Sequence, residues 1–345
     1  VLIVGAVTCS LIMFLNMPEG AGQTFSIASQ YHKFSLGSFS ASLTQETFWI
    51  ILLYGIVINL QNFGIDQNYV QRYIASKTDR DARKSVWLGG LLYVPVSALF
   101  FLIGTQLFSY YHVHKTQMND LRHIIAAQQI KEKGLTPETP DYTAAVEQSA
   151  LTLREEDIGD KVFPHFIGIN LPSGITGLVI AAIFAAGMST VSTSLNSSAT
   201  LMILDWYQRY LRPKASEKEM MLGLYSATIL WGLLGTSAAL LLIRVTSALD
   251  AWWTLSGIFG GGMLGLFLLG MISRSAGNSA AATGTLLGIG IICWMTFSSK
   301  LAIVPTSLQS RFHAFLIPVA GTLTILLIGL LMTLFQKRKG ETVVT

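Results

Sequence analysis

A run of serine, threonine and asparagine side chains lies in the otherwise apolar stretch 185–200. At 3.6 residues per turn, five of them share one face of a helix: Ser189, Ser192, Thr193, Asn196 and Thr200. This face offers neutral oxygens and no carboxylate, which suits a weakly held monovalent cation such as sodium better than calcium or magnesium. Small and hydroxyl-bearing residues also line contacts between membrane helices, so the spacing alone fits either role.

A second polar group begins before another long apolar segment, 47–74, has ended. Its first members are Asn59, Gln61, Asn62 and Phe63. Gly64 follows directly, and a kinked or unwound backbone forms most easily at glycine. Broken helices whose backbone groups face a central cavity are a recurrent binding device of secondary transporters. We therefore expect these four side chains to line a cavity, with an ordinary helix end at the membrane interface as the alternative.

The same segment continues toward its cytoplasmic end with charged and amide side chains. These are Asp66, Gln67, Gln71 and Arg72. Ionisable groups at membrane depth usually pair with one another. We interpret the four residues as an inner gate or a structural lock.

The composition indicates an all-α, polytopic membrane protein. Of the 345 residues, 51% are hydrophobic and 12% are charged, about half the charged fraction of a soluble domain. Apolar runs of about 20 residues, long enough to cross a bilayer as a helix, recur along the chain. We expect a single transmembrane domain over 1–345 with spans at 1–17, 47–74, 85–110, 174–204, 220–244, 250–272, 279–298 and 312–336.

Basic residues set the expected orientation in the plasma (inner) membrane. Lysine and arginine gather after the second, fourth and eighth spans, and the positive-inside rule then places both ends of the chain in the cytoplasm. The net charge of +4 follows from this bias, so the expected partners are the lipid bilayer and a small-molecule solute, not nucleic acid.

The long polar stretch 111–165 is then an extracellular insertion. Within it, 116–133 predicts an amphipathic surface helix, and 162–173 predicts a short helix at the membrane surface. The histidines at 112, 114 and 123 are expected to be solvated surface residues, with a metal site as the less favoured alternative.

Two of these stretches resemble motifs of the sodium:solute symporter family. The string Asn59…Gly64-Ile65-Asp66-Gln67…Val70-Gln71-Arg72-Tyr73 is similar to the family pattern N-x-x-x-x-G-x-[DN]-Q-x-x-[VI]-Q-R. The hydroxyl run after Phe184-Ala185-Ala186 resembles the family's sodium-site helix, and 251–270 resembles a later family helix more loosely. The family's W-T-D-x-x-Q motif would precede Val1, so we expect this chain to be the C-terminal portion of a longer protein.

The resemblance implies a leucine-transporter-type fold with its first repeat mostly ahead of Val1. It also implies sodium as the coupling ion and no organic cofactor. The principal sodium site would take the carbonyl of Ala186 and the hydroxyls of Ser189 and Thr190. Some members, notably sialic acid symporters, carry a second sodium site, whose hydroxyl positions correspond here to Ser189, Ser192 and Thr193.

The resemblance leaves the solute open. Members that carry galactose or glucose use a lysine and a glutamine where this chain has Tyr93 and Trp253, so we do not expect an identical hexose site. The two aromatic residues would line the solute cavity or serve only in packing. The favoured solute is a sugar or a sugar acid such as sialic acid, and the alternatives are monocarboxylates, vitamins or amino acids.

The alternative classes of function are a membrane sensor module, an intramembrane enzyme and a channel. The family's architecture also occurs fused to signalling domains as a membrane sensor module, but no room for a kinase follows 336–345. An intramembrane enzyme would need a histidine, a cysteine or paired carboxylates at membrane depth, and the sequence does not place them there. A channel would be separated from a symporter by uptake kinetics.

Overall fold

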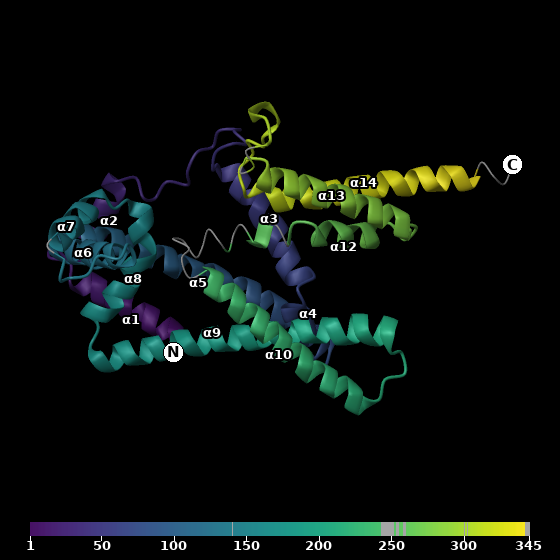
Figure 1. Cartoon of the computed structure of the whole chain (residues 1–345), viewed down its shortest axis with the longest axis horizontal. Coiled ribbons are helices and arrows are strands. Elements are labelled where there is room, and N and C mark those ends of the chain that lie inside the picture. Colours follow the sequence, from purple (N-terminus) through teal and green to yellow (C-terminus); the bar gives the residue numbers. More distant parts are fainter. Residues whose placement is uncertain are drawn as a thin grey trace. The chain divides into compact units, whose positions relative to one another are not determined.

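The computed structural model describes residues 1–139, 141–242, 252, 255–257, 260–299, 301 and 303–341, leaving out the side chains of 155, 156 and 337–341. Regular secondary structure in these residues is helical (Figure 1), and an isolated bridge between Ser38 and Thr47 is the one strand-type pairing among them. The chain divides into two compact units, which are described one at a time. The first comprises Val1–Ser35 and Trp87–Ala248, and the second comprises Leu36–Val86 and Leu249–Thr345.

The first unit is built around three long apolar helices. Its elements are α1 (Leu2–Leu15), α2 (Ala21–Gln30), most of α5 (Asp79–Val113), α6 (Lys115–Glu132), α7 (Tyr142–Thr152), α8 (Glu155–Asn170), α9 (Ser173–Thr200), the π-helix η1 (Leu201–Leu211) and α10 (Glu217–Leu241). Helix α1 lies against α9, where a Cβ on Gly5 would come 2.8 Å from Cγ2 of Val179. The small residue thus lets the two backbones approach closely, as is common between membrane helices.

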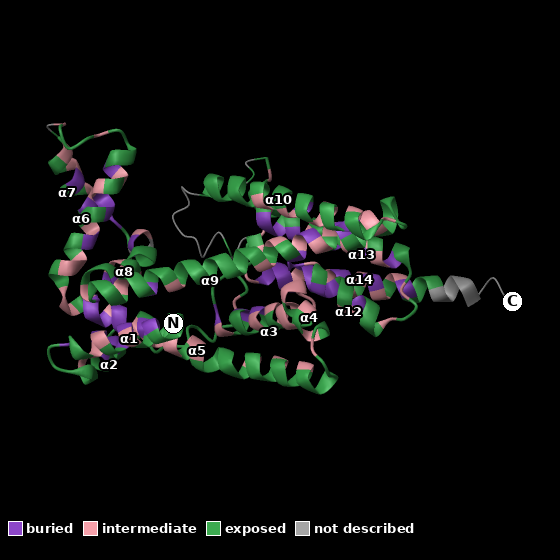
Figure 2. Ribbon diagram, turned by 90° about the horizontal axis from the view of Figure 1, so that it is seen from below, coloured by how far each residue is buried: buried purple, intermediate pink, exposed green. Residues whose placement is uncertain are grey.

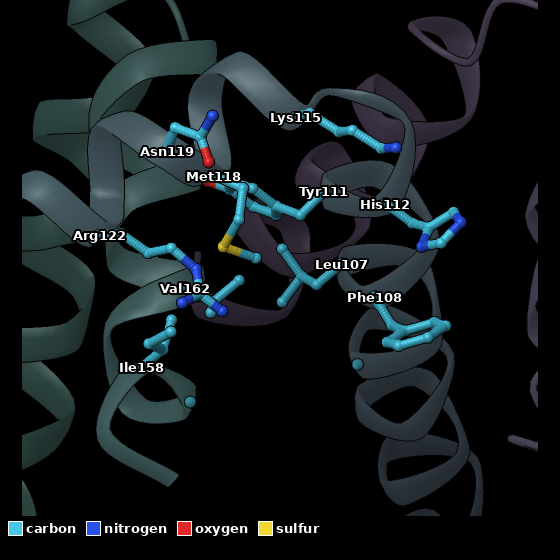
Figure 3. Close-up of a pocket in the computed structure, with 12 residues that line it drawn as sticks. Leu107, Phe108, Tyr111, His112, Lys115, Met118, Asn119, Arg122, Ile158 and Val162 are labelled. Carbon is cyan, nitrogen blue, oxygen red and sulfur yellow. The ribbon is translucent and has the colours of Figure 1, made fainter. Parts of the chain in front are cut away.

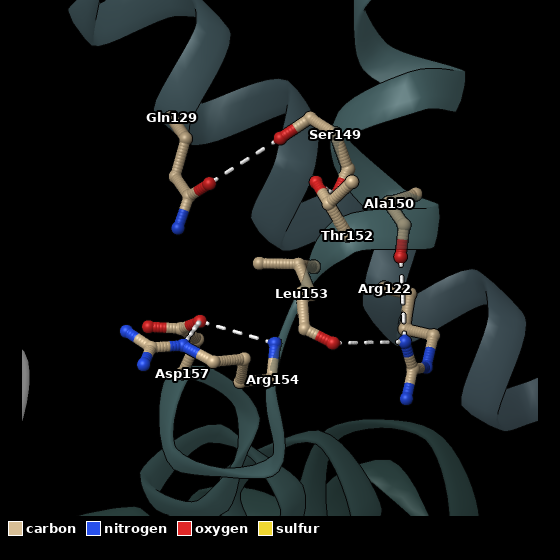
Figure 4. Close-up of polar contacts among 8 residues, drawn as sticks. All are labelled: Arg122, Gln129, Ser149, Ala150, Thr152, Leu153, Arg154 and Asp157. Atoms are coloured by element: carbon tan, nitrogen blue, oxygen red, sulfur yellow. Dashed lines mark hydrogen bonds and ion pairs between the residues drawn. The ribbon is translucent and has the colours of Figure 1, made fainter.

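Helices α6, α7 and α8 gather at the C-terminal end of α5 (Figure 1). The hydroxyl of Tyr110 on α5 donates to Oδ1 of Asn170 at the end of α8, at 2.9 Å, and Gln117 on α6 exchanges hydrogen bonds with the same asparagine. The guanidinium of Arg122 on α6 donates through Nη1 to the carbonyls of Ala150 and Leu153, both at 3.3 Å (Figure 4). These bonds cap the C-terminal carbonyls of α7, where a positive charge also complements the helix dipole.

The second unit consists of α3 (Phe48–Gly64), α4 (Gln67–Ile74), α12 (Met263–Ile272), α13 (Asn278–Phe297), the short 3-10 helix η3 (Thr306–Leu308) and α14 (Leu316–Glu341). Helices α13 and α14 pack along their lengths with glycine at the contact: a Cβ on Gly284 would lie 2.8 Å from the carbonyl oxygen of Ile325. Ile325 is almost fully buried there. Close backbone approach at glycine, rather than large interlocking side chains, holds this pair together.

Five described helices are long and apolar enough to cross a membrane: Asp79–Val113, Ser173–Leu211, Glu217–Leu241, Asn278–Phe297 and Leu316–Gln336. Most of the apolar side chains on α5, α9 and α10 are exposed within the unit (Figure 2). Such extensive apolar surface is unfavourable in water and is typical of helices in lipid or against other membrane helices. The chain is therefore a multi-pass membrane protein.

The other expected spans take less regular forms. The segment 47–74 is the bent pair α3–α4, with 43° between the two helices. The expected span 1–17 contains the 14-residue α1, and 250–272 contains α12 next to residues outside the described part of the chain.

Expectations for the connecting segments were met in part. The surface helix expected at 116–133 is α6, one residue earlier at each end. The helix expected at 162–173 starts much earlier, as α8 at Glu155, where Oδ2 of Asp157 accepts from the backbone N–H of Arg154 at 3.1 Å and stabilises the first turn. Neither α7 nor α2 was expected, since both are short and weakly patterned.

Candidate functional site

Helix α9 carries the hydroxyl run without a break. The hydroxyl of Thr190 donates to the carbonyl of Ala186 at 3.0 Å, and that of Thr193 donates to the carbonyl of Ser189 at 2.9 Å. Each bond uses the hydroxyl proton, so the hydroxyl oxygen keeps lone pairs that can accept from a donor or contact a cation. The helix therefore presents closely spaced pairs of oxygens, one carbonyl and one hydroxyl in each.

The spacing of these oxygens fits a small cation. Oxygens that ligate calcium, an ion similar in size to sodium, lie about 2.3–2.6 Å from it. Two such ligands can stand about 3 Å apart, as the Ala186 and Thr190 oxygens do. The pair supplies two ligands from one helix, so an ion held there needs further oxygens from another element.

The remaining side chains of this face are available for such a role. Ala186, Ser189, Thr190 and Ser192 are exposed within the unit, and Thr193 is partly buried. Further along the helix, Ser197 and Ala199 are buried, next to the contact with α10. The middle of α9 is thus the part that its own unit leaves uncovered.

The second group of predicted residues lies where α3 ends and α4 begins. Helix α3 stops at Gly64, and the carbonyl of Gln61 accepts the backbone N–H groups of both Ile65 and Asp66, at 3.0 and 3.1 Å. Helix α4 then starts with Asp66 as its N-cap, whose Oδ1 accepts from the N–H of Asn68 at 2.8 Å. The break expected at Gly64 is present, and a capping aspartate stabilises it.

The cavity residues expected on α3 have different surroundings. Asn59 folds back on its own helix, donating from Nδ2 to the carbonyl of Gly55 at 2.7 Å. Asn62 is partly buried, and the ring of Phe63 packs against that of Tyr69, with centroids 5.4 Å apart. The residues expected in an inner gate, Gln67, Gln71 and Arg72, lie on α4; the two glutamines are partly buried and Arg72 is exposed.

Gln61 differs from these neighbours because its amide lies against another segment of the second unit. A Cβ on Gly260 would come 2.6 Å from Nε2 of Gln61, so this close approach requires glycine. Oε1 of Gln61 is buried and has no hydrogen-bond partner in the described part of the chain. An amide acceptor left in this state is costly unless a bound molecule or water uses it.

Two further predicted residues stand apart from these groups. Tyr93 lies on α5 and is 64% exposed in its unit. Trp253 falls outside the described residues.

A pocket that the sequence did not indicate lies between α5, α6 and α8 (Figure 3). Its volume is about 530 Å³. The lining combines apolar and aromatic side chains with Lys115, Arg122 and His112. A signal was available in the helical spacing of Lys115, Met118 and Arg122, which places them on one face of α6. From the sequence we expected only an amphipathic surface helix there.

The wall of this pocket is supported by a partly buried histidine, His165. The hydroxyl of Tyr111 lies 2.7 Å from Nδ1 of His165 on α8, and Nε2 of that ring is buried without a described partner. Burial lowers the pKa of His165, and the negative charge of Asp120 partly opposes the shift. The ring is therefore neutral at physiological pH.

Comparison with known proteins places the chain in a family. The model of the sodium:solute symporter family matches residues 1–288. The chain is 29% identical over 331 residues to the sodium/sialic acid symporter NanT of Aliivibrio fischeri, covering 95% of this chain and 56% of the relative. It is 27% identical over 313 residues to the sodium-coupled monocarboxylate transporter 2 of Mus musculus, covering 89% of this chain and 44% of that protein.

A solved structure agrees with these relationships. A Na+-coupled sialic acid symporter, in a substrate-bound outward-open state, superimposes with a TM-score of 0.74 at 25% identity, covering 96% of this chain and 59% of that one. The expected all-α, leucine-transporter-type fold is thereby confirmed. The chain spans a little over half the length of NanT and of this structure. This chain belongs to the sodium:solute symporter family.

Proposed function

We propose that this chain forms part of a sodium-coupled symporter, which imports a small organic solute by alternating access. The observation that carries the proposal is the run of hydroxyl side chains on α9, of which Ser189, Thr190 and Ser192 are exposed in their unit. Membership of the sodium:solute symporter family supports sodium as the ion. Membership of that family favours transport as the function rather than catalysis.

The principal sodium ion binds the Ala186 carbonyl and the hydroxyls of Ser189 and Thr190, together with oxygens from a part of the protein that this chain does not span. A second sodium ion binds one turn further on, at Ser189, Ser192 and Thr193. Downhill entry of sodium supplies the free energy for solute uptake, and the membrane potential adds about 2.3 kcal/mol per charge for each 100 mV.

The favoured solute is a sugar acid such as sialic acid, in keeping with the similarity to NanT. The solute contacts the residues near the α3–α4 break, with Gln61 and Asn62 as contributors. A monocarboxylate is the alternative, since the chain is also similar to a monocarboxylate transporter. Both kinds of solute carry a carboxylate.

The protein lies in the plasma (inner) membrane with both ends of this chain in the cytoplasm. Lys77 before α5, the basic residues in the first turns of α5, and Arg212 and Lys214 after η1 support this orientation. In the full-length protein, a cysteine introduced at Lys133 should react with a membrane-impermeant maleimide added outside intact cells, and one at Lys214 should not. The reverse pattern would overturn the orientation.

The sodium site is tested by uptake of labelled sialic acid into proteoliposomes containing the full-length protein. Ser189→Ala should raise the sodium concentration needed for half-maximal uptake by roughly tenfold, the equivalent of about 1.4 kcal/mol. Ser194→Ala is the matched control, because it makes the same change on the same helix outside the proposed ligand set. Equal sodium activation in the two variants would contradict the assignment.

A further inference from the structure

The pocket between α5, α6 and α8 concentrates positive charge on an apolar wall. The side chain of Arg122 extends from α6 toward Ile158 and Val162, and Lys115 lies at the opposite edge, near His112 (Figure 3). A third cation stands close by: Nζ of Lys33 is 4.2 Å from the ring centroid of Phe108, which lines the pocket. Such a cluster attracts an anion.

These cationic side chains have N–H groups that could donate hydrogen bonds to a ligand. Arg122 uses Nη1 for the two carbonyls at the end of α7, and no described residue accepts from its Nε or Nη2. Among the described side chains, no carboxylate forms an ion pair with Lys115 or Lys33. The planar guanidinium of Arg122 matches the two oxygens of a carboxylate, and Lys115 adds positive charge at the opposite edge of the pocket.

The remaining walls of the pocket favour a ligand whose carboxylate is attached to an organic group with apolar surface. Leu107, Phe108, Tyr111, Met118 and Val162 present apolar and aromatic surface, and Asn119 adds an amide. A volume of about 530 Å³ is in the usual range for a site that encloses one small molecule.

The extent of the pocket argues for a dissolved solute rather than a membrane lipid. Its lining on α5 stops at Gly104 and does not continue to Phe101, which is 79% exposed. An acyl chain would need to extend along α5 past Gly104 to the exposed surface at Phe101. Two glycines, Gly104 and Gly159, leave open space where a Cβ would point.

We propose that this pocket binds a small organic carboxylate, at a site distinct from the sodium ligands of α9 and the break in α3–α4. Because the solutes favoured above also carry a carboxylate, the pocket serves as a second binding site for the transported class of molecule. This last step rests on the proposed function. Binding of the anion itself does not.

The test measures equilibrium binding of N-acetylneuraminate to the purified full-length protein in nanodiscs of neutral lipid, first without sodium. Omitting sodium suppresses the proposed coupled site and leaves the pocket. We expect saturable binding that Lys115→Glu and Gly159→Leu each weaken at least tenfold, by charge reversal and by filling the cavity. The neutral methyl ester of the same sugar should bind at least tenfold more weakly.

Matched variants control for folding and for overall charge. Lys133→Glu makes the same charge change just beyond α6, outside the pocket lining. Gly168→Leu adds the same side chain to α8, again where a Cβ meets open space. Both controls should bind N-acetylneuraminate as the unmodified protein does.

The two proposals fail in different ways. Absence of the sodium-free component, while sodium-dependent binding persists, would overturn the pocket assignment alone. A sodium-free component with the expected variant pattern, but with no effect of sodium on binding or uptake, would overturn the symporter and leave the pocket. If Lys115→Glu changes only the retention of phosphatidylglycerol in anionic nanodiscs, the site is a lipid site and the carboxylate proposal is wrong.

Discussion

The hydroxyl of Tyr111 lies 2.7 Å from Nδ1 of His165, and this contact joins the end of α5 to α8 beside the pocket. The opposite ring nitrogen, Nε2, is buried with no partner among the described residues. The contact therefore suits a neutral imidazole, because a protonated ring would place a positive charge in a poorly solvated position.

Acidification should weaken the packing of α8 on α5. Because burial lowers the pKa of His165 in the folded protein, the unfolded chain binds the proton more readily. The stabilising contribution is complete above the ordinary histidine pKa of about 6.5 and is lost as pH falls toward the lower folded value. Thermal unfolding of the purified protein between pH 8 and pH 5 should show this decline.

His165→Phe should flatten that pH dependence, since the titrating group is removed while the ring volume is kept. His123→Gln serves as control because His123 is exposed on α6. An unchanged slope in His165→Phe would show that another group causes the acid sensitivity.

Adding one methyl group at the α13–α14 contact should destabilise the protein. In Gly284→Ala the new Cβ would lie 2.8 Å from the carbonyl oxygen of Ile325, so the two backbones must separate. Overpacking of this kind costs about 1–3 kcal/mol, and the melting temperature should fall by several degrees. Gly290→Ala, on the same helix with open space at its Cβ, should leave the melting temperature unchanged or raise it slightly.

Thr190→Val should weaken sodium activation of uptake while preserving the helix. The variant keeps the shape of the side chain and removes the oxygen that pairs with the Ala186 carbonyl. We expect about a tenfold rise in the sodium concentration for half-maximal uptake. Thr236→Val on α10 removes a similar hydroxyl, which donates to the carbonyl of Gly232, and should have no effect on sodium activation. Similar shifts in both variants would point to a general effect of losing a hydroxyl.

Gln61→Leu should separate a solute-binding role from a packing role. The substitution removes an amide whose Oε1 is buried without a described partner, so the free energy of unfolding should stay the same or increase. If this amide contacts the solute, the solute concentration for half-maximal uptake should rise by about fivefold or more, a change of about 1 kcal/mol. Higher stability with unchanged uptake kinetics would assign Gln61 to packing against Gly260 alone.

Several features of the fold were predictable because their causes are local. Hydropathy over about 20 residues located the membrane helices, and a glycine followed by a capping aspartate explains the break between Gly64 and Asp66. The pairing of each threonine hydroxyl with the carbonyl four residues earlier on α9 also follows from helix geometry. The weakly patterned helices α2 and α7 were missed for the same reason: they carry little local signal.

The sequence by itself determined that this is an all-helical membrane protein and which helix carries the hydroxyl face. Only the tertiary structure decided that Gln61 meets Gly260, that Gly284 meets Ile325, and that α5, α6 and α8 enclose a cationic pocket. Residues in these contacts are separated by up to about 200 positions, and whether they touch depends on side-chain volumes and backbone approach summed over whole helices. Hydropathy and helical periodicity are local averages, so they cannot determine which distant surfaces come together.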